Sequence, residues 1–238
     1  MSKKAILILL IAVSAVVLSV FLFVGHQHRV SADGFVSAYG EYVEAADQQE
    51  AAAYLPGAAA NFIREKLDRS LSILLTDDIE PKDRMDVAVG ALNLTKELEL
   101  QIDDIGAKRN SVEIAISRLK DLSGTINDEN LAEQVREIIE LAENKTIIIA
   151  DIRGLSYSIN GETKKIIGRI IAENGLLTDA HIIELNRRIP EDEKRFDRQK
   201  ELYQQLSDLD NRIEEKYNEF RSSLGSGIIP PHFFSVGR

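Results

Sequence analysis

Residues 81–123 read PKDRMDVAVGALNLTKELELQIDDIGAKRNSVEIAISRLKDLS. Pro81 suits the first position of a helix, where its missing N–H costs nothing, and no breaker follows before Ser123. The apolar residues recur at alternating steps of four and three, with Arg109 on the same seam. They are Leu98, Ile102, Ile105, Val112, Ile116 and Leu119. This heptad stripe predicts one helix about 65 Å long, ended by Gly124 in the left-handed conformation.

A second heptad stripe follows the first, behind a helix cap at Asn127 or Asp128. Its members keep the four–three spacing through residue 159. They are Leu131, Val135, Ile138, Ala142, Ile149, Ile152 and Ile159. The spacing predicts a second long helix antiparallel to the first.

One part of this second stripe has a competing interpretation. Residues 146–149 (TIII) have strong β propensity, and Asn160-Gly161 is a hairpin signal, so strands 146–159 and 162–171 are conceivable. We favour helix, because the heptad spacing continues and a lone hairpin is marginal in water. Asn160-Gly161 is then expected to end the helix.

Shorter helices are predicted on both sides of these two. Upstream, one follows from about residue 35, Pro56-Gly57 interrupts it, and the next covers residues 58–75 before a turn at 76–78. Downstream, a short helix stops at Asn174-Gly175, Thr178 caps another, and Pro190 begins the last. The last helix carries a stripe of apolar residues to about residue 222: Phe196, Leu202, Leu206, Leu209, Ile213, Tyr217 and Phe220.

Composition excludes several classes of function. The chain has 238 residues and a net charge of −10, which repels phosphate backbones, so nucleic acid is not an expected partner. It has no cysteine, which excludes disulfides, thiolate metal sites and cysteine nucleophiles. Sparse aromatics with abundant Ala, Leu, Ile, Glu and Lys favour a helical bundle.

The N-terminus carries an apolar run from Ala5 to Val24, interrupted only by Ser14 and Ser19. At about 1.5 Å per residue the run spans about 30 Å, the thickness of the hydrocarbon core. Residues 1–25 are therefore predicted to be a transmembrane anchor that contacts lipid. A cleaved signal peptide with its cut near Val30-Ser31-Ala32 is the alternative, although signal-peptide apolar regions are shorter.

The charges around the run predict its orientation. Lys3 and Lys4 precede the run and only Arg29 follows it closely. The positive-inside rule therefore favours a cytoplasmic N-terminus, with residues 26–224 as an extracytoplasmic bundle.

No catalytic, metal or cofactor constellation is recognisable in the sequence. His26 and His28 are two residues apart next to the anchor, and His181 lacks the Glu-x-x-His spacing of a di-metal bundle. HExxH, G-x-S-x-G and Walker motifs do not occur. The chain is therefore predicted not to be an enzyme, and no cofactor is expected.

The C-terminal residues 225–238 form an apolar tail behind a Gly-Ser-Gly linker. Ile229, Pro231, Phe233 and Phe234 are candidate residues for docking to a partner protein, and folding back onto the bundle is the equal alternative.

The sequence as a whole predicts an all-α protein: one N-terminal transmembrane helix followed by an elongated bundle with coiled-coil segments. Its expected function is a membrane-anchored scaffold or adaptor that binds a protein partner or self-associates through helical seams. The general shape resembles the extracytoplasmic bundles of membrane sensors such as chemoreceptors, although the sequence has no second membrane span. A sensor-type ligand-binding bundle and an enzyme with an unrecognised carboxylate site are the alternatives, the latter requiring carboxylates from distant helices with raised pKa values.

Overall fold

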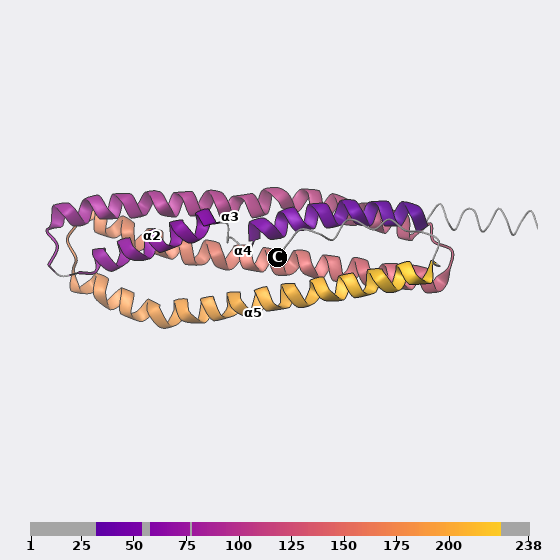
Figure 1. The fold of residues 1–238 in the computed structure, drawn as a ribbon. Helices are drawn as coiled ribbons and strands as arrows, with labels where there is room; N and C mark the ends of the chain where they lie inside the picture. The colour runs from indigo at the N-terminus through magenta and orange to yellow at the C-terminus, as the bar shows by residue number, and fades with distance from the viewer. Residues whose placement is uncertain (1–31, 54–57, 77, 225–238) are drawn as a thin grey trace, which may run out of the picture.

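The computed structural model describes residues 32–53, 58–76 and 78–224, and all regular structure among them is helical (Figure 1). After a helix at 32–53 come α2 (Ala58–Leu74), α3 (Pro81–Ser123), α4 (Glu129–Ala172) and α5 (Asp179–Ser223). The all-α prediction is confirmed. The alternative hairpin within 146–171 is wrong, because α4 runs through the whole of that segment.

The helices form an elongated antiparallel bundle. α2 packs on α3, α3 on α4, and α4 on α5. The helix 32–53 and α2 follow one another along one side of the bundle, so that together they run beside the long helices (Figure 1). Helices of 43 to 45 residues make the bundle about 65 Å long. The α2–α3 and α4–α5 connections lie at one end, and the start of helix 32–53 lies at the other.

The predicted heptad stripes form the core. All six stripe residues of α3 are buried, as are the central members of the α4 stripe. Aromatic side chains attach helix 32–53 to α5: Tyr39 stacks on Tyr217 at 3.7 Å between ring centroids, and Phe35 meets Phe220 edge-on at 5.0 Å. Each such fully buried large side chain contributes roughly 1.5–3 kcal/mol.

The described core side chains come from different helices along the bundle. Near the α2–α3 connection, the described buried apolar side chains belong to α2, α3 and α4. Leu202 is the first buried apolar residue among the described α5 side chains, and the preceding Phe196 is 48% exposed. The prediction that Phe196 lies on the packed stripe is therefore wrong. Among the described α5 side chains before Leu202, the buried ones are polar, His181 and Gln199.

Two predicted helix boundaries are also wrong. Asn160-Gly161 lies inside α4, where Asn160 is buried and its Nδ2 donates to the Thr95 carbonyl of α3 at 2.9 Å. This hydrogen bond satisfies a group that would otherwise favour a turn. Pro190 lies inside α5 instead of starting a helix. It is exposed, and the missing backbone hydrogen bond is tolerated within a long helix that α4 supports.

The helix termini confirm part of the predicted capping. Asp128 is the cap of α4, and its Oδ1 accepts from the Leu131 N–H at 3.0 Å. Gly124 has φ −67°, so the predicted left-handed end of α3 is wrong. Left-handed residues occur instead at Asn174 (φ 54°) and Gly175 (φ 79°), where a helix stop was predicted.

No helix within the described ranges is long and apolar enough to cross a membrane. The predicted anchor, residues 1–25, lies outside the described residues, and so does the predicted C-terminal tail, residues 225–238.

Candidate functional site

A buried ionic layer lies in the middle of the bundle, where helix 32–53, α4 and α5 meet. Lys145 of α4 is only 5% exposed. Its Nζ lies 2.5 Å from Glu50 Oε2 of helix 32–53 and 2.5 Å from Asp210 Oδ1 of α5. One ammonium group thus joins helices that are far apart in the sequence.

The positions of these residues follow from the helix periodicity. Lys145 is three residues after Ala142 and four before Ile149, so it occupies a core position of α4. Asp210 is likewise four residues after Leu206 and lies beside the stripe of α5. Placing a lysine on the inner face requires acidic partners from the facing helices, since an unpaired buried charge is very costly.

The carboxylates outnumber the cation in this layer. Asp47 lies one turn before Glu50 at the exposed edge of the layer, and partial burial raises its pKa although Lys145 opposes the change. Burial and the nearby Glu50 raise the pKa of Asp210 to about 6, against the attraction of Lys145. Burial alone would lower the pKa of Lys145. The attraction of its ammonium group to Asp210 and Glu50 is stronger, so the pKa is raised. The layer therefore holds an excess of negative charge that favours proton uptake.

A phenol completes the inner side of this layer. Tyr42 is almost fully buried, and its hydroxyl has no hydrogen-bond partner within the described residues. Burial, together with Asp210, Glu50 and Asp47, raises its pKa, so the phenol stays neutral. On the other side, Gln49 Nε2 lies 3.5 Å from the Ile105 carbonyl of α3. The polar layer thus extends across the bundle from helix 32–53.

Chemically, this arrangement can hold a proton and can fix the register of three helices. It also meets the condition set for the enzyme alternative, because carboxylates from distant helices come together with raised pKa values. Lys145 uses two of its hydrogen bonds on Asp210 and on the neighbouring Glu50, which is the arrangement of a structural ion cluster. The absence of enzymatic activity stays a prediction, and so does the sensor alternative.

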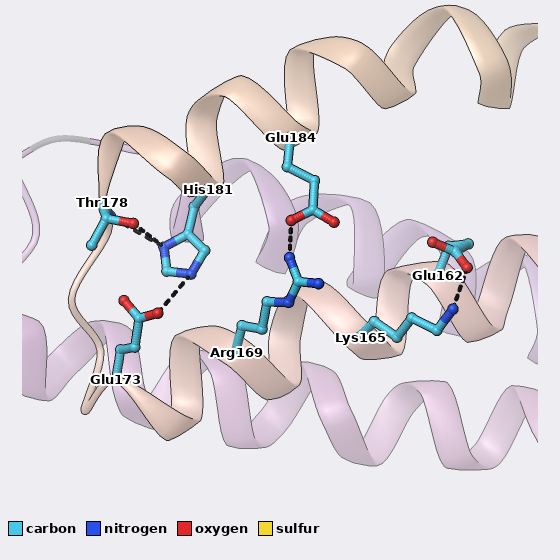
Figure 2. Close-up of polar contacts among 7 residues, drawn as sticks. All are labelled: Glu162, Lys165, Arg169, Glu173, Thr178, His181 and Glu184. Atoms are coloured by element: carbon cyan, nitrogen blue, oxygen red, sulfur yellow. Dashed lines mark hydrogen bonds and ion pairs between the residues drawn. The ribbon is translucent and has the colours of Figure 1, made fainter.

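A second polar cluster lies at the α4–α5 connection (Figure 2). His181 is buried, its Nδ1 accepts from the Thr178 N–H at 3.1 Å, and its Nε2 lies 3.4 Å from Glu173 Oε1. This geometry assigns the ring proton of the neutral histidine to Nε2. On the outside, Arg169 pairs with Glu184 across the two helices.

The role of His181 is therefore to cap α5 and tie it to the end of α4. In the described part of the chain, no group of three or more His, Asp or Glu side chains could hold a metal ion. Arg84 performs a similar task beside it, since Nη1 donates to the Gly175 carbonyl at 3.1 Å and Nη2 to the Thr76 carbonyl at 2.7 Å. These contacts join both connections at this end of the bundle.

The outer face of α3 carries an apolar stripe that the sequence analysis missed. Leu100 is 71% exposed and Ile114 is 61% exposed, and exposed Ala107 lies midway between them at seven-residue steps. These residues lie on the face opposite the buried stripe. The sequence signal was one apolar position that recurs every seven residues, offset from the inner stripe, and the stronger inner stripe hid it.

The residues predicted as a docking tail (Ile229, Pro231, Phe233 and Phe234) lie outside the described residues, as do His26, His28 and His232. Of the four histidines, His181 alone can be placed, and it is a cap residue. Lys145, Glu50 and Asp210 were not singled out from the sequence. A charged residue in step with an apolar stripe was the signal that could have found Lys145.

No family model, no curated protein and no solved structure matches this chain. The fold and the two polar clusters define the described region as an elongated antiparallel helical bundle with a buried ionic layer. Function must therefore be argued from this chain's own residues.

Proposed function

We propose that this protein is a non-enzymatic helical scaffold, tethered to a membrane by residues 1–25, that self-associates through the outer face of α3. The seven-residue spacing of Leu100, Ala107 and Ile114 is the observation that carries the proposal. The inner face of α3 is filled by its own chain, whereas this stripe has large side chains exposed at 71% and 61%.

The occupant we propose for this face is a second copy of the chain in parallel orientation. Copies tethered in the same membrane share a direction, and a heptad stripe is in register with itself when two copies are related by an axis along the helix. Leu100 then faces Leu100 and Ile114 faces Ile114, with small Ala107 allowing close approach between them.

The cysteine-free sequence allows a direct test by crosslinking. Full-length Leu100→Cys protein, expressed in membranes and treated with a mild oxidant, should form a disulfide-linked product of twice the chain mass. Ile114→Cys should behave in the same way, because parallel register brings each position onto its own counterpart. Non-reducing gel electrophoresis measures both.

Ile147→Cys is the matched control, because Ile147 is 58% exposed and lies on the outer face of α4. The proposal requires little or no product from this variant. Equal crosslinking at all three positions would show random collision, and monomer at positions 100 and 114 would refute self-association through α3.

The tether is tested separately by fractionation. Full-length protein should sediment with membranes and be released by detergent but not by high salt or alkali. Recovery of the intact chain, first residues included, in the soluble fraction would remove the membrane part of the proposal. The crosslinking result would stand on its own in that case.

A further inference from the structure

We propose that the ionic layer of Glu50, Lys145 and Asp210 is a pH-sensitive contact, which holds helix 32–53 against α4 and α5 more tightly in mild acid than at neutral pH. This inference is independent of the proposed self-association. It rests first on geometry: a single ammonium group lies 2.5 Å from carboxylates of two different helices.

The charge balance of the layer gives the direction of the response. From helix 32–53 it receives Asp47 and Glu50, with the neutral phenols of Tyr39 and Tyr42. From α4 it receives Lys145, and from α5 Asp210. α3 faces this part of the core with Ile102 and Ile105. One cation therefore meets up to three carboxylates, so one added proton relieves repulsion.

Asp210 is the group that takes up this proton. Its carboxyl group is within hydrogen-bonding reach of Glu50, so in its protonated form it can donate to the Glu50 carboxylate while Lys145 remains paired. The pKa of Asp210 is raised from 3.8 to about 6 by burial and by Glu50, against the attraction of Lys145. Once Asp210 is neutral, fewer charged carboxylates compete for the ammonium group of Lys145.

The sign of the effect follows from linkage. A carboxyl whose pKa is higher in the folded than in the unfolded chain binds its proton preferentially in the folded state. Stability from this group is therefore fully present below the unfolded value of 3.8 and is lost as the pH rises through about 6. Each unit of pKa shift corresponds to about tenfold in the folding equilibrium. Asp210 is 35% exposed, and solvent screening reduces the effect.

The test compares urea unfolding of the full chain in detergent at about pH 5 and about pH 7.5, followed by far-UV circular dichroism. We expect the unfolding equilibrium constant of the wild type to be about five- to tenfold smaller at the lower pH. Asp210→Asn keeps the shape of the side chain and removes the titrating group, so most of this difference should disappear. Other groups also titrate in this interval, and the assignment rests on the difference between the two proteins.

Asp208→Asn is the matched control, since Asp208 is an exposed carboxylate on the same helix. It should retain the wild-type pH dependence. A wild type that becomes more stable as the pH rises, or an Asp210→Asn variant that keeps the full pH dependence, overturns the proposal. Should that variant not fold, carbon NMR of aspartate-labelled wild type decides: a carboxyl titrating near pH 6 supports the proposal, and titration of every aspartate below about pH 5 refutes it.

Discussion

At the scale of single residues, Gly175 allows the α4–α5 connection to approach α3 closely. Its φ is 79°, and a Cβ atom at this position would lie 1.9 Å from the carbonyl oxygen of Pro81. Gly175→Ala therefore adds both left-handed backbone strain and a clash with backbone atoms that cannot move freely. We expect the free energy of unfolding, measured by urea titration, to fall by about 2–3 kcal/mol.

The matched control is Gly161→Ala. Gly161 lies inside α4, and a Cβ atom there would meet nothing within 4 Å. Alanine in a helix interior is favoured over glycine, so this variant should be more stable by about 0.5–1 kcal/mol. Opposite signs for the two substitutions are the expected result. A loss of stability at both positions would show that the difference in backbone environment was assigned wrongly.

Single-residue features were partly predictable from the sequence. Asn174-Gly175 and Asp128 were recognised because turn and cap residues act through local hydrogen bonds and backbone freedom. Lys145 was not recognised, because a charged residue in step with a stripe is usually solvated, and its partners Glu50 and Asp210 are 95 and 65 residues away. Sequence spacing within one helix carries no information about which carboxylates the facing helices supply.

At the scale of elements, α5 continues through Pro190 from Asp179 to Ser223. Proline removes one backbone hydrogen bond and costs about 3 kcal/mol relative to alanine in a helix interior. Pro190 is exposed, so its ring makes no core contact that alanine would lose. Pro190→Ala should raise the free energy of unfolding by about 1–3 kcal/mol and slow amide exchange in the surrounding turns.

Glu191→Ala, at the next exposed position, serves as the comparison, and its effect should stay within about 0.5 kcal/mol. Urea titration and hydrogen exchange of both variants provide the measurement. A destabilised Pro190→Ala variant would mean that α4 requires a locally distorted α5, and the expected gain would be wrong.

The long helices were predictable as elements because each carries a heptad stripe over many turns, and the six stripe residues of α3 are all buried. The boundaries at Asn160-Gly161 and Pro190 were predicted wrongly for a common reason. Both are strong local signals, and in both cases contacts between helices outweigh them: Asn160 bonds to the Thr95 carbonyl, and α4 contacts α5 at Glu184 before Pro190 and at Gln199 after it. Local propensity is a weak prior within a packed bundle.

At the scale of the whole molecule, the sequence predicted a bundle but not its cross-section. The stripes require partners, yet they do not specify that helix 32–53 and α2 share one side of the bundle. The place of helix 32–53 follows from the aromatic contacts of Phe35 and Tyr39 with α5. The candidate site arises from this arrangement, so it could not be read from one helix at a time.

The ionic layer gives the last prediction at this scale, because Lys145 joins three helices. Lys145→Met removes the cation and leaves the carboxylates of Glu50 and Asp210 facing each other in the core. Breaking a fully buried pair costs about 3–5 kcal/mol, and the partial exposure of Asp210 reduces our expectation to about 2–3 kcal/mol at neutral pH. The loss should be smaller near pH 5, where Asp210 with its pKa of about 6 is protonated.

Removing all three charges separates the role of the ion cluster from that of its shape. Lys145→Met combined with Glu50→Gln and Asp210→Asn leaves only Asp47, at the exposed edge of the layer, and uncharged replacements of buried ion clusters are often neutral in stability. The triple variant should therefore recover most of the free energy of unfolding that the single substitution loses, with a stability that varies less with pH. Urea titration of the wild type, the single variant and the triple variant at both pH values measures this. A triple variant as unstable as Lys145→Met would show that the side-chain packing of Lys145, and not its charge, holds helix 32–53 to α4 and α5.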